Sequence, residues 1–416
     1  MDKKKSKSFK VFYVLFAMLL ISLVFTGCSV FGSPNIVYIY QTGDTGGVVN
    51  TKDGLIETID NIEDSVVEVY ARTSDGISCG SGVLIDTTNQ EDTTLNRRYF
   101  VVTNFHVIDS GYAIQVNFTR LDKKFNAQLV GGDEQSDIAV LMFETTECAN
   151  NCECKTTSTN NPTPCTSCDD KCKCGCTFKG VKFADSDNLK LGQTCIVIGN
   201  PLGSLGGSVS IGNISYLNRV VTVENLDMTL IQTTATINSG NSGGGMFDTN
   251  GNLIGIVNAK ASGTGVEGIG FAIPSNEVMD KCSQLIATSK INDNGVVTDY
   301  GYIQGRTNFG ITATYSNNTV YVASISTTSA FYGLQGTYST SENGQVYGRA
   351  KINTNDKIVS INKVVIANLD NFVDSISNLK IGDSVKIVVI RTIGYNDYYI
   401  TVTATLSQYC YEMPTL

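Results

Sequence analysis

The stretch NSGNSGGG, residues 238–245, sets a serine among glycines and decides how the rest of the chain is interpreted. Glycine adopts backbone dihedral angles that other residues avoid, so Gly240 and Gly243 permit a sharp turn that exposes the Ser242 hydroxyl. The same turn allows the N–H groups of Gly240 and Ser242 to point into one small space. Two such donors can bind the negative oxygen of a tetrahedral intermediate. The stretch therefore predicts a nucleophilic serine beside an oxyanion hole.

A serine hydroxyl needs a neighbouring base, and the chain of 416 residues contains a single histidine, His106, in TNFHVI (103–108). Asp137, in SDIAVL (136–141), stands at the start of an apolar run and is the best candidate to orient the imidazole. The order His106, Asp137, Ser242 is the order of a chymotrypsin-type triad. We predict these three residues as base, orienting acid and nucleophile. A lone histidine also excludes a histidine-based metal site, and we expect no cofactor.

Short β-branched runs recur between turn signals from residue 56 to about 285, without a long helical period between them. This spacing is typical of a β-barrel or sandwich. The runs are SVVEVYA (65–71), YFVVTNF (99–105), AIQVNF (113–118), IAVLMF (138–143), CIVIGNP (195–201), LIQTTATI (230–237) and NLIGIVNA (252–259). A helical period in PSNEVMDKCSQLIATSK (274–290) predicts a helix that closes this mainly β domain.

Eight stretches together resemble the HtrA-type (Deg-family) trypsin-like serine proteases. They are GSGVLID (80–86), VVTNFHVI (101–108), SDIAVL (136–141), ADSDNLKLGQ (184–193), IGNPLG (198–203), IQTTATINSGNSGGG (231–245), GNLIGI (251–256) and GIGFAIPS (268–275). The resemblance implies a chymotrypsin-like double β-barrel with the triad and the oxyanion hole (Gly240 and Ser242) at the positions above. It also implies unfolded protein or peptide substrates and a homo-oligomer, a trimer in this family. Phe105 departs from the pattern, because the family usually has asparagine there.

The resemblance also implies a pocket for the substrate residue that precedes the scissile bond. Its expected walls are Thr236, Ile237, Asn238, Val257, Asn258 and Ala259. No acidic residue stands among them to bind a substrate lysine or arginine. We expect small aliphatic residues such as valine, alanine or isoleucine to be accepted there.

Residues 300–407 have the strands and the single helix of a second unit, which resembles a PDZ domain. Such a domain adds an extended peptide to a sheet edge and binds its carboxylate with backbone N–H groups. In RTNFGI (306–311), Phe309, Gly310 and Ile311 match the carboxylate loop, and Arg306 is expected to assist. Residues 335–351 are longer than this pattern needs and are interpreted as an insertion. The alternative is a small β-rich domain without a peptide site.

The N-terminal residues 1–27 are interpreted as a leader: five lysines precede the apolar run Val11–Phe25. The leader ends in VFTGCS (24–29), which resembles the lipobox of bacterial lipoproteins. We therefore expect lipidation of Cys28 and an extracytoplasmic protein anchored to the bacterial membrane; an uncleaved anchor helix is the alternative. Residues 28–55 are interpreted as a tether. A net charge of −9 argues against a nucleic-acid surface.

Eight of the 13 cysteines crowd into residues 148–176, within an insertion expected at 145–178. They are Cys148, Cys152, Cys154, Cys165, Cys168, Cys172, Cys174 and Cys176. Outside the cytoplasm such a polar segment favours disulfides, and a thiolate metal cluster is the alternative. Cys79, Cys195 and Cys282 are interpreted as buried apolar residues, and Cys410 is unassigned.

The protease domain is expected at residues 56–290. The function that follows is a membrane-anchored serine endopeptidase that cleaves unfolded or damaged proteins. The alternatives are a peptide-binding chaperone with an idle active site and a metal-binding surface protein on the same scaffold.

Overall fold

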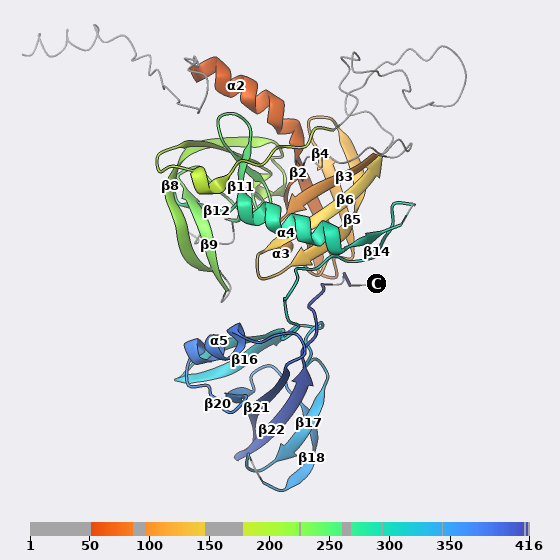
Figure 1. The fold of residues 1–416 in the computed structure, drawn as a ribbon, viewed down its shortest axis with the longest axis vertical. Coiled ribbons are helices and arrows are strands. Elements are labelled where there is room, and N and C mark those ends of the chain that lie inside the picture. Colours follow the sequence, from red (N-terminus) through yellow and green to blue (C-terminus); the bar gives the residue numbers. More distant parts are fainter. Residues whose placement is uncertain are drawn as a thin grey trace, which may run out of the picture. The chain divides into compact units, whose positions relative to one another are not determined.

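Two closed six-stranded barrels form the N-terminal part of the fold (Figure 1). The computed structural model describes residues 51–85, 97–145, 178–223, 226–259, 268–292, 294–342, 344–411 and 413–414. Residues 1–57 and 58–416 are separate units, and of the first unit only the beginning of one helix is described.

The first barrel is antiparallel throughout, and its strands are β1 (Val66–Thr73), β2 (Gly76–Ile85), β3 (Arg97–Thr103), β6 (Ile138–Thr145), β5 (Lys123–Asp133) and β4 (Ala113–Phe118), in hydrogen-bonded order. Strand β6 runs apolar almost without interruption, and its first six residues are all buried. Its neighbour β3 pairs with it along the whole length, from Arg97 opposite Thr145 to Thr103 opposite Ala139. This pairing brings the ends of the two strands, and the residues next to them, to one edge of the barrel.

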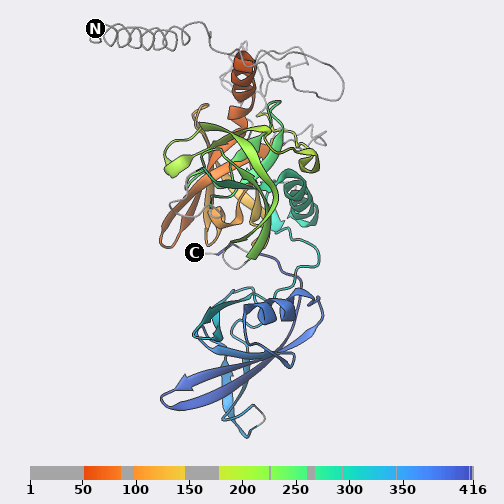
Figure 2. The same ribbon diagram turned by 90° about the vertical axis from the view of Figure 1, so that its left-hand side faces the viewer.

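The second barrel repeats this arrangement with β10 (Gly245–Phe247), β11 (Leu253–Val257), β12 (Gly270–Pro274), β9 (Leu226–Thr233), β8 (Ser208–Val223) and β7 (Thr194–Gly199). Figure 2 shows both barrels turned by 90°. The predicted double β-barrel is thus confirmed. Strand β8 was not predicted, because most of its residues are exposed or half-buried and leave no apolar run in the sequence.

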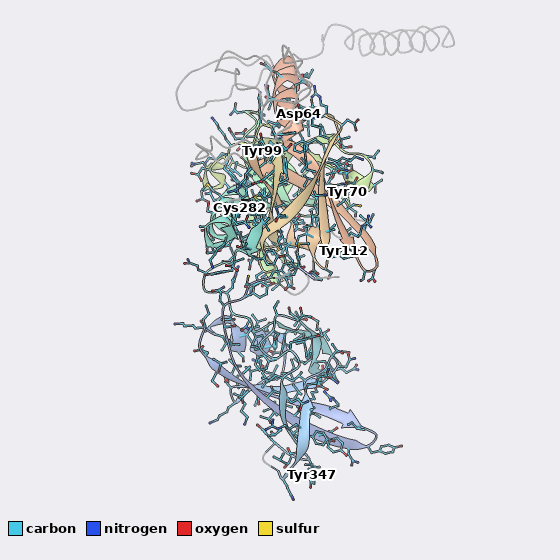
Figure 3. The ribbon with its side chains drawn as sticks, turned by 90° about the vertical axis from the view of Figure 1, so that its right-hand side faces the viewer. Asp64, Tyr70, Tyr99, Tyr112, Cys282 and Tyr347 are labelled. Atoms are coloured by element: carbon cyan, nitrogen blue, oxygen red, sulfur yellow. The ribbon has the colours of Figure 1, made fainter. Side chains whose placement is uncertain are left out.

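Helices cover or precede the barrels: α2 (Thr51–Ile62), α3 (Phe105–Ile108) and α4 (Ser275–Thr288), with 3₁₀ turns at Glu63–Ser65, Ser186–Asn188 and Pro201–Gly203. Helix α4 matches the predicted closing helix and packs against strands of both barrels. Its buried Cys282 is labelled in Figure 3. Helix α2 begins at Thr51, inside the range 28–55 that is predicted as a tether. No helix of the described residues is long and apolar enough to span a bilayer.

The C-terminal part contains one antiparallel sheet with its own hydrophobic core. Its strands are β15 (Ile311–Ser316), β16 (Thr319–Ile325), β19 (Lys357–Ile361), β21 (Ser384–Ile393), β22 (Asn396–Thr405), β17 (Gln335–Ser339) and β18 (Val346–Lys351), with β20 (Val364–Val365) beside β19. Helix α5 (Leu369–Ser377) packs against β15 and β20. A two-stranded ribbon, β13 (Lys290–Ile291) and β14 (Val297–Asp299), precedes the sheet.

The stretch 335–351, interpreted above as an insertion, is ordered as the hairpin β17–β18. Strand β17 pairs with β22, so the hairpin extends the sheet at one end. Strand β15 lies at the opposite end and leaves a free edge. Tyr347, on the outer strand of the hairpin, is 62% exposed and is labelled in Figure 3.

Candidate active site

His106 and Asp137 meet at the rim of the first barrel. His106 lies on α3, just after β3, and Asp137 immediately precedes β6. The His106 Nδ1 atom is 2.8 Å from Oδ2 of Asp137, and the His106 backbone N–H donates to Oδ1 at 2.9 Å. An ionised carboxylate only accepts hydrogen bonds, so Nδ1 carries the proton and Nε2 of the neutral ring is left as a base.

A strained turn presents Asp137. Its φ of 53° lies in the left-handed region, which aspartate tolerates better than most residues. The turn is closed by a hydrogen bond from Asp137 N–H to the Glu134 carbonyl at 3.2 Å. The Asn104 side chain donates to the Asp137 carbonyl at 2.9 Å, and both residues are buried. Such strain is retained where neighbouring contacts fix the backbone, as they do here.

Asn258 completes the surroundings of the carboxylate. Its side-chain amide donates to Oδ2 of Asp137 at 3.0 Å, and Asn258 is fully buried at the end of β11. Asp137 therefore binds the ring and the backbone of His106 from one barrel and Asn258 from the other. Asn258, predicted as a wall of the substrate pocket, thus directs its side chain at Asp137.

Ser242 lies in the loop before β10, and the residue is 5% exposed to solvent. Its carbonyl accepts a hydrogen bond from Ser81 N–H at 2.8 Å, which ties the loop to strand β2 of the first barrel. A Cβ on Gly80 would contact both Val107 of α3 and the Ser242 carbonyl, so the serine loop and the histidine helix meet at this strand. The structure thus joins His106 to Asp137 and places the Ser242 loop against the strand that helix α3 contacts.

The Ser242 hydroxyl accepts a hydrogen bond from Ala259 N–H at 3.2 Å. Within the described ranges, it makes no hydrogen bond to His106. Hydrogen bonds of this kind are often long or poorly aligned without substrate and tighten when it binds. A rotation about the Cα–Cβ bond of Ser242 would change its partner without moving the backbone.

The backbone around Ser242 leaves two donors free. In the described part of the chain, the N–H groups of Gly240 and Ser242 have no hydrogen-bond acceptor, whereas Asn241, Gly243 and Gly244 each donate to a carbonyl. Gly240 has a φ of 94°, and a side chain there would collide with the Asn200 carbonyl. Glycine is therefore required at 240, as the motif predicted, and the free donors match an oxyanion hole.

Ser81 is a functional candidate that sequence reasoning missed. Its Oγ donates to the Gly240 carbonyl at 2.8 Å and accepts from Asn200 N–H at 2.8 Å. Ser81 is fully buried, and its own carbonyl accepts from Thr103 Oγ1 at 2.7 Å. It thereby fixes the peptide plane that follows Gly240. The motif GSGVLID contains Ser81, but only the fold shows which loop it contacts.

The family comparison agrees with this geometry. The model of the trypsin-like peptidase domain family matches residues 80–256. The matched range contains His106, Asp137, Ser242 and the loop that bears Gly240.

Curated relatives point the same way. The chain is 38% identical over 217 residues to the periplasmic serine endoprotease DegP of Salmonella typhimurium, which is 52% of this chain and 37% of that protein. It is 30% identical over 343 residues to the probable periplasmic serine endoprotease DegP-like of Rickettsia prowazekii, covering 81% of this chain and 55% of the relative. It is 30% identical over 307 residues to the serine protease Do-like HtrA of Lactobacillus helveticus, covering 71% of this chain and 63% of the relative.

The chain thus spans little more than a third of the length of DegP and under two thirds of the other two relatives. Together with the domain match, these relatives show that the chain is similar to serine endoproteases of the HtrA/DegP type.

The six residues predicted as walls of the substrate pocket have different surroundings. Val257 packs into the core of the second barrel and Asn258 binds Asp137, so neither side chain forms a wall. Thr236 and Asn238 line a cavity of about 240 Å³ whose remaining lining is Val197, Pro201, Ser208, Val209, Ser210 and Asn241. Ile237 does not line this cavity and packs against Gly270, and Ala259 is half-buried beside Ser242.

In the C-terminal sheet, the predicted carboxylate loop lies at the start of the edge strand β15. Phe309 is buried, and its carbonyl accepts from Ser329 Oγ at 2.5 Å. Gly310 has a φ of 56°, and its carbonyl accepts from Ser326 N–H at 2.8 Å. In the described residues, the N–H groups of Phe309 and Gly310 have no acceptor. Ile311 begins β15 and is buried.

Arg306 does not lie where we expected. Its Nη2 atom is 3.2 Å from Oδ2 of Asp133, a carboxylate that is 1% exposed. The same oxygen accepts from Ser136 N–H at 3.0 Å and from Ser136 Oγ at 2.7 Å. A buried carboxylate attracts a counter-charge, which accounts for this partner. Arg306, predicted to assist the carboxylate loop, thus directs its guanidinium at Asp133.

The remaining predictions concern cysteines and metals. Cys28 and the cysteines of 148–176 lie outside the described residues. Cys195 and Cys282 are buried as predicted, and burial raises the pKa of Cys282 to about 12. Cys79 is only half-buried, which corrects its assignment. The described residues contain no cluster of histidine, cysteine, aspartate or glutamate that could hold a metal ion.

Proposed function

We propose that the chain is an extracytoplasmic serine endopeptidase, anchored to the membrane, that cleaves unfolded or damaged proteins. The observation that carries the proposal is the contact of the only histidine with Asp137 at 2.8 Å, beside a serine whose loop presents two free N–H donors.

Each residue has a defined part in acyl transfer. Nε2 of His106 takes the proton of Ser242 as its Oγ attacks the substrate carbonyl carbon. The N–H groups of Gly240 and Ser242 bind the oxyanion, and Asp137 stabilises the imidazolium that forms. The imidazolium then protonates the leaving amine, which releases the first product. Water, activated by His106, hydrolyses the ester on Ser242 and restores the enzyme.

Substrate choice follows from the C-terminal sheet and the cleft. Strand β15 has a free edge, and α5 packs beside it, so an extended peptide can add as a further strand. The free N–H groups of Phe309 and Gly310 suit a terminal carboxylate. Unfolded proteins offer extended segments and accessible C-termini, whereas folded proteins offer few of either.

Anchoring and assembly belong to the same proposal. Two relatives carry the word periplasmic in their names, which supports a place outside the cytoplasm. A lipidated Cys28 would hold the chain at the membrane, since two acyl chains give a stable anchor. Mass spectrometry of the mature N-terminus tests this, because an unlipidated, intact leader would contradict it. A trimer is proposed from the family resemblance and is tested by the sedimentation velocity of the purified chain.

The cysteine segment is proposed to be cross-linked by disulfides, because a short polar stretch cannot build a core of its own. Mass spectrometry under non-reducing conditions should find no free thiols among its eight cysteines. Reduced cysteines with stoichiometric zinc or copper would favour the metal cluster instead.

A peptide-binding chaperone with an idle active site is the second candidate, favoured by the hydrogen bond that Ser242 makes to Ala259 rather than to His106. Digestion of casein separates the two functions. The purified chain should cleave casein, and Ser242→Ala should leave it intact. A wild-type chain that binds casein without cleaving it would establish the chaperone.

A further inference from the structure

The C-terminal tail, residues 407–411 with Met413, returns to the peptidase domain beside the catalytic histidine. Tyr411 is 8% exposed and belongs to the core of the first barrel. Its ring meets that of Phe105 edge-on, with 4.7 Å between ring centroids. Phe105 opens helix α3 and directly precedes His106. The contact joins residues that are some 300 positions apart in the sequence.

Polar contacts fix the same tyrosine. Its hydroxyl accepts a hydrogen bond from Ser110 N–H at 3.1 Å and donates to Oδ1 of Asp109 at 3.4 Å. Both partners follow α3 directly, so Tyr411 contacts the residue before His106 and the residues after the helix. Burial raises the pKa of Tyr411 to about 12, so the hydroxyl stays protonated at neutral pH.

The tail is itself held in place by the segment that leads into the C-terminal sheet. Tyr409 N–H donates to the Arg306 carbonyl at 2.8 Å, and the Gln408 side chain donates to the Ile303 carbonyl at 2.8 Å. Arg306 in turn binds Asp133, at the base of the turn that presents Asp137. The two segments therefore contact the peptidase domain next to both members of the His106–Asp137 pair.

From these contacts we propose that Tyr411 is a positioning residue for catalysis. Its ring packs against Phe105 and holds α3 so that the His106 imidazole keeps its contact with Asp137. The helix has only four residues, Phe105–Ile108, and its N-cap Asn104 makes no side-chain capping bond, so outside contacts must fix its orientation. This inference rests on the proposed peptidase function, but it concerns the position of His106, which can be observed without activity.

The test compares three variants of the full chain. Tyr411→Ala removes the ring, Tyr411→Phe keeps the ring and removes the hydroxyl, and Tyr395→Ala removes a tyrosine that is fully exposed in the turn between β21 and β22. Because His106 is the only histidine, protein labelled with ¹³C-histidine and purified without a histidine tag gives one imidazole signal by NMR. Steady-state cleavage of a short chromogenic peptide supplies kcat and KM.

Tyr411→Ala should shift or broaden the imidazole signal and lower kcat about tenfold, with KM changed less than about threefold. Tyr411→Phe should retain most of kcat, and Tyr395→Ala should match the wild type. An unchanged signal and kcat in a folded Tyr411→Ala chain, or an equal loss in Tyr395→Ala, would overturn the proposal.

If Tyr411→Ala fails to fold, as judged by circular dichroism, Tyr411→Leu keeps the apolar volume without the ring and decides by the same criteria. If the wild-type chain cleaves no peptide, the proposed function fails. The imidazole signal then still decides whether Tyr411 positions His106.

Discussion

The amide of Asn258 donates to Oδ2 of Asp137 at 3.0 Å, the same oxygen that His106 Nδ1 approaches at 2.8 Å. One carboxylate thus joins a residue of the second barrel to the histidine of the first. Asn258 is buried, and its neighbour Ala259 contacts the Ser242 hydroxyl. The strand end at 257–259 therefore contacts both halves of the catalytic apparatus.

Replacing Asn258 by alanine should lower kcat/KM about 10- to 100-fold, because hydrogen bonds to charged groups contribute roughly 1.5–3 kcal/mol. Asn252→Ala is the matched control, since Asn252 donates to Asp248 at 3.0 Å in a turn away from the triad. Peptide hydrolysis by both variants checks the prediction. Equal rates in the two would show that the Asn258 contact has no part in catalysis.

Ser81→Ala should impair the enzyme through the oxyanion loop. The change leaves the Gly240 carbonyl and the Asn200 N–H without their common partner in a buried site, which costs about 1–3 kcal/mol of stability for each unsatisfied group. We expect a lower melting temperature and a kcat reduced about tenfold with little change in KM. Ser377→Ala, at an exposed hydroxyl of α5, is the control. A destabilised variant with normal kcat would limit Ser81 to a structural role.

Ile237 should set the size of the substrate pocket. Its side chain packs against Gly270, beside the loop that leads to Ser242. Ile237→Ala should open this space and raise the rate for leucine over valine before the scissile bond by about 10-fold or more, since one methylene is worth roughly 10–200-fold. Ile381→Ala, at an exposed isoleucine of the C-terminal part, should leave the ratio unchanged. The cleavage rates of a series of peptides measure this ratio of leucine to valine. An unaltered preference would show that Ile237 does not line the pocket.

The C-terminal sheet should bind peptides by their free carboxylates. In an uncleaving Ser242→Ala background, Gly310→Ala should weaken binding at least about tenfold, because a Cβ there would press on Ser329 in a left-handed conformation. Gly394→Ala, with a φ of 64° but open space around it, is the matched control. Arg306→Ala should leave affinity nearly unchanged, since Arg306 binds Asp133.

Calorimetry with one apolar-ending peptide in acid and amide forms completes this prediction. The acid should bind and the amide should bind much more weakly. Equal affinities for both forms would exclude the carboxylate loop at 309–311.

Sequence alone predicts the features that depend on local pattern. The buried run of β6, the helical period of α4 and the glycines around Ser242 each carry a signal within a few residues. Features that depend on distant contacts leave no such signal. Tyr411 meets Phe105 across the whole chain, and the side chain of Arg306 is directed by a buried carboxylate at 133.

Other misses have local causes. Strand β8 is exposed at half of its residues and half-buried at most of the others, so it lacks an apolar run. The hairpin β17–β18 has small and polar residues, so its two strands carry no apolar pattern in the sequence. Helix α2 has only a modest apolar face, and its start at Thr51 lies in a glycine-rich stretch. The sequence pattern therefore does not indicate where the helix begins.

The most direct test of the account is the covalent labelling of Ser242 by a fluorophosphonate, a reagent that reacts with serines activated by a neighbouring base. Peptide mass spectrometry should locate one adduct per chain on Ser242, and His106→Ala should abolish it together with peptide hydrolysis, which falls by roughly 10⁶ when such a base is lost in subtilisin. Labelling that persists in His106→Ala, or that falls on another serine, would contradict the assignment of His106 and Ser242 as base and nucleophile.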